Sequence, residues 1–292
     1  MAGAISLTFG WPTAAFADKL TSVMTRAVLS AICLPTDLDL RKWSCANAVG
    51  YLDLINHVSG QTQCNLTLSG RFYQGEFAPH EYLYLIPYES DCESHATLLG
   101  GSLIFAREHG NLVFKQYLRS EPLADYVGET MGKPSSDNCL VHHRPGDGDA
   151  LFCIISNGNM GSVDWNLAEI TLTHTATGYE ETGKDDWRIS KEMAESNPGV
   201  IPGINEAIAC PVSSDNEPYF FSLSGLRRAP VADTLAFTAH YVDHATAAAA
   251  CDHAHGQTPF FYGPIDRRKI KTGTFVYDIA SGKLGGSGRS GH

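Results

Sequence analysis

Residues 102–118 read SLIFAREHGNLVFKQYL, and this stretch decides the fold class. Apolar side chains alternate with polar ones before and after a central His109-Gly110-Asn111. Leu103 and Phe105 lie on the incoming segment, and Leu112 and Phe114 lie on the returning one. A period of two on both sides of a turn that contains Gly and Asn is typical of an antiparallel hairpin.

Strand-like segments continue in both directions from this hairpin. They are short, apolar or alternating, and cover residues 66–72, 82–86, 151–157, 164–173, 219–225, 234–242 and 273–279. Such segments outnumber the helical ones, which predicts a mainly β (α+β) protein built as an antiparallel β-barrel or sandwich.

The N-terminal part has a helical period instead. Over residues 13–33 the apolar side chains recur at helical spacing, namely Phe16, Leu20, Val23, Met24 and Ala27. Pro35 ends this predicted helix, and a second helix is predicted over about 38–58, ending at Ser59-Gly60. The fold therefore begins with a helical segment at about 13–58.

Domain organisation is predicted to be simple. Residues 119–149 and 176–217 are rich in loop-forming residues, but strands of the same character resume after each. We therefore expect a single β-rich domain over residues 1–284. Residues 285–292 are rich in Gly and Ser and read as a linker or tag remnant outside the fold.

Charge limits the partners. The chain has 292 residues with 21 Lys and Arg against 32 Asp and Glu, a formal charge of −11. Nucleic-acid binding needs a basic surface and anionic membranes attract cations, so neither partner is expected. No apolar run reaches the roughly 20 residues of a membrane span. The sequence thus predicts a soluble, acidic protein.

The cellular compartment is read from the N-terminus and the cysteines. Residues 1–17 end in a signal-peptidase-like AFA, yet they lack basic residues and are broken by Gly10 and Pro12. The eight cysteines include no closely spaced pair and several lie in apolar segments, which favours buried free thiols over disulfides. A cytoplasmic protein is therefore expected. The alternative is a secreted one, in which Asn65-Leu66-Thr67 would be a glycosylation sequon.

Several cofactor motifs are absent from the sequence. It contains no GxGxxG after a strand, no GxxxxGK[ST] and no GxSxG. These absences argue against dinucleotide-binding enzymes, P-loop NTPases and ordinary α/β-hydrolases, and no cofactor is expected.

His240 is the first candidate for acid–base chemistry. Leu235 and Phe237 share one face of the predicted strand 234–242, so His240 lies on the other. If that face lined an interior cavity, its imidazole could act as a general base or acid near neutral pH. The alternative is an exposed strand histidine.

Three further candidates are His80, Glu81 and Arg144. His80 and Glu81 are adjacent at the start of a strand, where side chains alternate, so only one of them can face a shared cavity. Arg144 lies in a predicted loop, and its guanidinium could clamp a substrate carboxylate. The alternative for Arg144 is a solvated loop cation.

A metal site is considered over residues 240–255, where His and Asp are dense. Asp243, however, fits the N-cap of an Ala-rich helix over 245–251, and His253 and His255 would complement the C-terminal end of its dipole. No HExxH pattern occurs. A structural or acid–base role is therefore preferred to metal binding.

Three functions remain. The preferred one is a cofactor-independent enzyme of the lyase, isomerase or cyclase kind, acting on a small and partly apolar organic molecule in a β-cavity. The second is a noncatalytic small-molecule or carbohydrate binding protein, because aromatic side chains in strands suit an apolar pocket. The third is a metal-dependent hydrolase that uses the histidines of 240–255.

Overall fold

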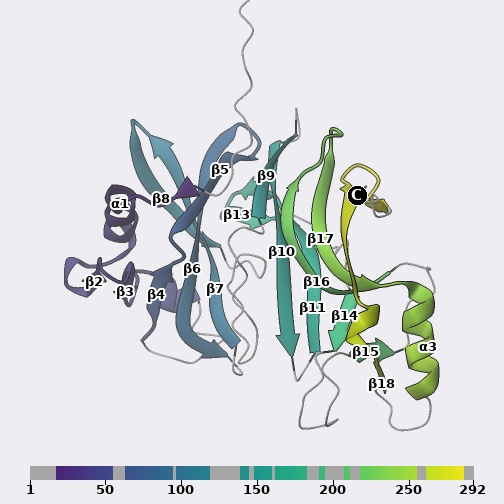
Figure 1. The fold of residues 1–292 in the computed structure, drawn as a ribbon. Helices are drawn as coiled ribbons and strands as arrows, with labels where there is room; N and C mark the ends of the chain where they lie inside the picture. The colour runs from purple at the N-terminus through teal and green to yellow at the C-terminus, as the bar shows by residue number, and fades with distance from the viewer. Residues whose placement is uncertain are drawn as a thin grey trace, which may run out of the picture.

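The computed structural model describes residues 18–54, 63–94, 97–118, 139–144, 148–159, 162–182, 191–194, 207–210, 218–254 and 261–285. Within them the chain is mainly β, with antiparallel sheets that include a curled half-barrel (Figure 1). The signal-peptide-like segment at 1–17 and the end of the predicted tag at 286–292 lie outside the described residues. Gly285 belongs to the last strand.

The predicted hairpin is confirmed. β7 (Thr97–Glu108) pairs antiparallel with β8 (Asn111–Leu118), and Glu108 faces Asn111 across the turn. His109 and Gly110 have φ of 51° and 86°, the left-handed conformation that a two-residue hairpin turn requires.

The first sheet is built around a long central strand. β6 (Glu81–Ser94) pairs with β7 on one side and, in succession, with β5 (Arg71–Ala78) and β4 (Asn65–Leu68) on the other. β3 (Ser44–Ala46) and β2 (Leu38–Asp39) follow β4, and β1 (Asp18–Lys19) pairs with β5.

Two further sheets and a hairpin form the rest of the fold. One sheet runs β18 (Phe261–Pro264), β15 (Ala207–Cys210), β14 (Lys191–Ala194), β11 (Ser162–Ile170), β10 (Gly148–Asn159) and β9 (Cys139–Arg144). The other runs β16 (Tyr219–Arg228), β17 (Thr234–Val242), β19 (Lys271–Asp278) and β20 (Lys283–Gly285). β12 (Leu172–Thr175) and β13 (Gly178–Glu181) form the separate hairpin.

The sheets are stacked, and β10 is buried on both faces. Leu151 packs into the core shared with the β5–β6–β7 sheet, whereas the next residue, Phe152, packs into the core shared with β16, β17 and β19. Side chains of adjacent strand residues point to opposite faces, so this one strand serves two cores. In Figure 1 the two outer sheets lie on either side of β10.

Helices lie at the two outer ends of this stack (Figure 1). α1 (Ser22–Ile32) covers the outer face of the first sheet through Val28, Leu29 and Ile32. α3 (His244–Ala254) packs on β15 and β18, and Asp243 caps it by accepting a hydrogen bond from the Thr246 N–H at 2.9 Å. The predicted capping role of Asp243 is confirmed.

The predicted N-terminal helices are only partly correct. α1 begins at Ser22 rather than at 13, because Asp18 and Lys19 pair with β5 as strand residues. Val23, predicted on the apolar face, is 76% exposed. The predicted helix over 38–58 is wrong over its first half, where β2 and β3 form; a helical turn begins only at Tyr51.

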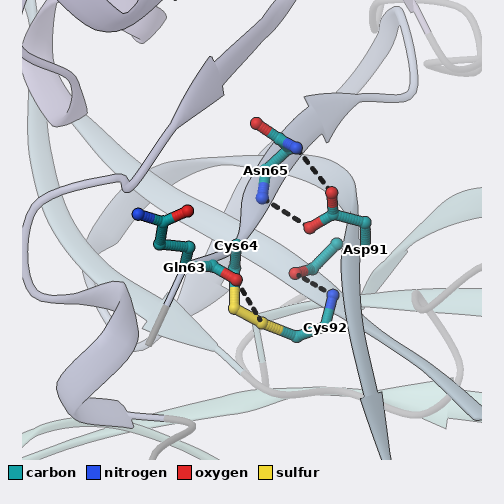
Figure 2. The surroundings of a disulfide bond; sticks show 6 residues. Gln63, Cys64, Asn65, Asp91 and Cys92 are labelled. Carbon is teal, nitrogen blue, oxygen red and sulfur yellow. Dashed lines mark hydrogen bonds between the residues drawn. A yellow bond between two sulfur atoms is a disulfide. The ribbon is translucent and has the colours of Figure 1, made fainter. Parts of the chain in front are cut away.

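The prediction of free thiols is wrong. All eight cysteines are paired, as Cys33–Cys45, Cys64–Cys92, Cys139–Cys153 and Cys210–Cys251. Cys139 and Cys153 face each other across β9 and β10, and Figure 2 shows the Cys64–Cys92 bond beside the start of β4. The partners are at least 12 residues apart in sequence and two of the bonds join a helix to a strand, so tertiary contacts bring the cysteines together and local spacing does not reveal them.

None of the helices in the described residues is both long enough and apolar enough to cross a membrane.

Candidate functional site

Three of the four predicted site residues lie near the turn between β5 and β6. His80 occupies this turn with φ 64°, and its N–H donates to Glu76 Oε1 at 2.9 Å. The imidazole of His80 is almost fully exposed, with 98% of its side-chain surface accessible. His80 therefore stands in solvent and faces no cavity wall.

Glu81, the next residue, joins a small polar cluster. Its Oε1 lies 2.6 Å from His174 Nδ1, and its Oε2 accepts a hydrogen bond from the Tyr179 hydroxyl. Burial alone would raise the pKa of Glu81, but the hydrogen bonds from Tyr179 and His174 outweigh it and hold the pKa below its ordinary value. The rings of His174 and Tyr179 stack with centroids 4.8 Å apart.

This cluster fastens the β12–β13 hairpin to the first sheet. The Gln116 side chain, from β8, accepts from the Tyr179 N–H at 2.7 Å and donates to the Tyr179 carbonyl at 2.8 Å. These two bonds imitate a strand pair. The Glu81 carboxylate adds a third attachment, so the main role of this cluster is to hold the β12–β13 hairpin on the first sheet. An ionised Glu81 that orients a half-exposed His174 could also relay a proton at the surface.

A second acid–histidine pair, absent from the sequence prediction, lies next to this turn. Asp149 of β10 is buried; its Oδ1 contacts His143 Nδ1, and its Oδ2 accepts the Glu76 N–H at 2.7 Å. The register of β5 and β6 shifts next to Gly75, which frees this N–H. A Cβ on Gly75 would clash with the Asp149 carboxylate, so glycine is required there. The sequence feature that could have identified Asp149 is its position as a carboxylate at the start of an apolar strand segment.

Arg144 ends β9, a strand where a loop was predicted. Its Nη1 donates to Glu169 Oε1 at 2.7 Å, and the Glu169 side chain is only 10% exposed. Its Nε donates to the Gly148 carbonyl at 3.4 Å. The guanidinium is therefore engaged within the sheet, and a substrate carboxylate would have to displace Glu169.

The inward orientation considered for His240 is wrong. Leu235, Phe237 and Ala239 bury one face of β17 in a core, and His240 is exposed on the other. Its Nδ1 lies 3.1 Å from the Ser222 hydroxyl of the neighbouring strand. The core beneath β17 is filled by aromatic rings, with Phe220 and Phe275 centroids 4.9 Å apart. His240 is thus an exposed strand histidine, the alternative given in the sequence-based prediction.

His142 is the buried histidine of the described chain. Its Nε2 lies 3.2 Å from Asp233 Oδ1, while its Nδ1 is buried without a hydrogen-bond partner. Burial lowers the pKa of His142 below its ordinary value, and the hydrogen bond to Asp233 offsets only part of this effect. The carboxylate needs a donor, so the neutral imidazole carries its proton on Nε2.

Metal-ligand geometry was also considered. In the part of the chain that the structure describes, no group of three or more His, Cys, Asp or Glu side chains is arranged to hold a metal ion.

A groove lies between α1 and β2. It has a volume of about 790 Å³ and is lined by Arg26, Ser30, Cys33, Pro35, Leu38, Asp39, Leu40 and Arg41. Arg26 and Ser30 are four residues apart, so they lie next to each other on the exposed surface of the helix. The groove therefore combines an apolar floor with two guanidinium groups.

Neither arginine forms an ion pair within the described residues. Asp39, the one acid of this groove, accepts hydrogen bonds from the main-chain N–H groups of Arg41 and Lys42 at 3.0 and 3.3 Å. Arg41 was placed inside a predicted helix, so the groove could not be anticipated without the disulfide that closes it.

A second, acidic groove lies over β3, β4 and β6, with a volume of about 460 Å³. Its acids are Asp37, Asp39, Glu89 and Asp91, beside Lys42. Figure 2 shows the Asn65 side chain of the predicted sequon facing Asp91. The Asn65 N–H and Nδ2 each donate to Asp91 at 2.5 Å, so both groups are already engaged.

Comparisons with known proteins identify no relative: no protein-family model matches the chain, and no curated protein or solved structure matches it significantly. Arguments about function therefore depend on the geometry of the chain itself.

Proposed function

We propose that this protein is a noncatalytic binding protein that holds a small carboxylate with an apolar body in the groove between α1 and β2. The observation that carries the proposal is the placement of Arg26 and Arg41 on one open groove with an apolar floor.

Charge supports an anionic ligand at this place. The whole chain has a formal charge of −11, yet the groove presents two guanidinium groups beside a single acid, Asp39. A guanidinium offers a planar fork of donors that matches a carboxylate. Because neither side chain is neutralised by an ion pair in the described structure, both can turn toward a ligand.

The floor supports an apolar body on that ligand. Pro35, Leu38 and Leu40 line the groove together with the Cys33–Cys45 disulfide. Apolar walls with a few charged groups are the usual composition of small-molecule sites, and 790 Å³ lies within their usual size range. A medium-chain fatty acid or an aryl-substituted carboxylate has this combination of groups.

Disulfide pairing supports a location outside the cytoplasm. Four disulfides use every cysteine of the chain. Such bonds persist in oxidising compartments and are rare in the cytosol. In place of the cytoplasm expected from the sequence, the proposal therefore puts the protein in an oxidising compartment, which suits capture of ligands in the periplasm or outside the cell.

Calorimetric titration with decanoate tests the proposal. We expect decanoate to bind, and Arg26→Gln and Arg41→Gln each to weaken binding by about tenfold to a hundredfold, because a charge-assisted hydrogen bond is worth roughly 1.5–3 kcal/mol.

Lys42→Gln is the matched control. Lys42 is adjacent to Arg41 but lines the other groove, so its removal should leave decanoate binding within about twofold of the wild type. Decanol, which lacks the carboxylate, should bind weakly and equally to all variants. No decanoate binding, or equal binding by both arginine variants and the wild type, would disprove the proposal.

A further inference from the structure

We infer that the Cys33–Cys45 disulfide positions the ligand groove, so that the groove is assembled only in the oxidised chain. The inference rests on the proposed function for its ligand, but it also makes a structural prediction that needs no ligand.

The groove is divided between two segments that this disulfide joins. Arg26 and Ser30 belong to α1, whereas Pro35, Leu38, Asp39, Leu40 and Arg41 all lie in the loop between the two cysteines. Cys33 is the C-cap residue of α1, and Cys45 lies in β3 opposite Leu38. The bond therefore ties the end of the helix to the strand pair that carries Arg41.

Within the described residues the loop has three further attachments: Leu38 and Leu40 pack on the core of the first sheet, the Leu68 N–H donates to the Trp43 carbonyl at 2.9 Å, and β2 pairs with β3. β2 is an edge strand of only two residues, paired with β3 alone. Within the loop, the Asp37 N–H donates to the Leu34 carbonyl at 2.9 Å, a local turn that does not reach α1. Without the disulfide, these weaker contacts alone would hold the loop that carries Arg41 against α1, so residues 34–42 and the spacing of the two arginines would loosen.

The fold itself should survive loss of this bond. α1 remains packed through Val28, Leu29 and Ile32, and the Val49 N–H donates to the Ile32 carbonyl at 2.7 Å. Removal of the disulfide would thus release the groove wall while the sheet beneath it stays in place.

Assembly of the groove includes one redox step. The two thiols lose two electrons and two protons, which reduce an oxidant of the disulfide class to two thiols through a mixed disulfide. A dithiol reductant reverses the step. Ligand binding is therefore confined to compartments whose poise keeps Cys33–Cys45 oxidised.

The test compares two double variants of the full chain. Cys33→Ser with Cys45→Ser removes the bond at the groove, and Cys210→Ser with Cys251→Ser removes one between β15 and α3 at the opposite end of the stack. In the first variant we expect hydrogen exchange of the amides of residues 34–42 to accelerate at least tenfold and decanoate binding to weaken at least tenfold. In the second variant both should stay within about twofold of the wild type.

The two readouts separate the two claims. Unchanged exchange of residues 34–42 in the first variant would overturn the inference, whatever decanoate does. Faster exchange there, with no decanoate binding even by the wild type, would support the positioning role and disprove the proposed ligand. Exchange of the β5–β6 amides serves as the folding control. If it also accelerates, the same comparison is made on the wild type before and after mild reduction with a dithiol.

Discussion

At the scale of single residues, buried polar groups connect the sheets of this protein. Asp149 of β10 accepts a main-chain N–H of β5 and also contacts His143 of β9. His142, the neighbour of His143 on the other face of β9, contacts Asp233. Each therefore joins its strand to a different neighbour. A buried polar group is costly when a partner is missing, so these residues should respond strongly to substitution.

His142 should make the protein less stable in mild acid. Burial lowers the pKa of its folded-state imidazole below the ordinary value of 6.5, so the unfolded chain binds the proton more readily. Its stabilising contribution is then fully present above pH 6.5 and is lost as the pH falls toward the folded pKa. One proton changes the free energy of unfolding by at most about 1.4 kcal/mol per pH unit. Arg228 and Arg144, which also face this imidazole, act in the same direction.

Denaturant unfolding between pH 7.5 and pH 5 checks this expectation. His142→Phe removes the titrating group next to Phe152 and should flatten the pH dependence relative to the wild type. His240→Phe, an exposed histidine, should leave the dependence as it is in the wild type. A constant difference in unfolding free energy between His142→Phe and the wild type across this range would contradict the assignment.

At the scale of elements, the β12–β13 hairpin depends on a few side chains. The side-chain amide of Gln116 makes two hydrogen bonds with the main chain of Tyr179, as a neighbouring strand would. Glu81 contacts His174 and Tyr179. Gln116→Leu keeps a similar size but leaves the Tyr179 N–H and carbonyl without these partners. We expect it to accelerate hydrogen exchange of the amides of residues 178–181 by about tenfold or more, because an unsatisfied buried group costs roughly 1–3 kcal/mol.

Gln116→Glu is the informative companion. It keeps an acceptor for the Tyr179 N–H but loses the donor to the Tyr179 carbonyl, which its carboxylate repels. We therefore expect the amides of residues 178–181 to exchange faster than in the wild type. Lys115→Gln, which alters an exposed neighbour on the same strand, should leave the hairpin amides unchanged. Equal exchange of residues 178–181 in Gln116→Leu and the wild type would show that the hairpin is held by other contacts.

How well each element could be predicted from sequence depended on how local its determinants are. The 102–118 hairpin and the helix capped by Asp243 follow from neighbouring residues, and both are confirmed. The predicted strand 66–72 is instead broken at Gly70, whose φ of 82° starts a turn between β4 and β5. Helical spacing over 38–46 was overridden by pairing with β4 and by a disulfide. These are distant contacts that a local pattern does not contain.

The candidate site residues show the same difference between local and distant determinants. Glu81 lies at a strand start, as the sequence predicts, and it contacts His174 and Tyr179, but these partners come from a hairpin far along the chain. His240 was misjudged because alternation places it opposite Phe237 without telling which face is covered. Only the position of the neighbouring sheets decides that.

At the scale of the whole molecule, β10 couples the sheets. Leu151 belongs to a core with Leu83 and Ile104 of the first sheet, and Phe152 to a core with Phe237 of β17. Both side chains are fully buried. A strand that supplies two cores with alternate residues cannot leave one of them without disturbing the other, which favours a single cooperative unit over two independent domains.

Calorimetry of two single variants tests this coupling. Leu151→Ala and Phe152→Ala should each destabilise the protein by about 3 kcal/mol, and each should shift one common unfolding transition, although the two side chains face opposite sheets. Val231→Ala, at a side chain that is 67% exposed, should shift it by less than about 0.5 kcal/mol. Two separate transitions, one moved by Leu151→Ala and the other by Phe152→Ala, would show that the sheets unfold independently.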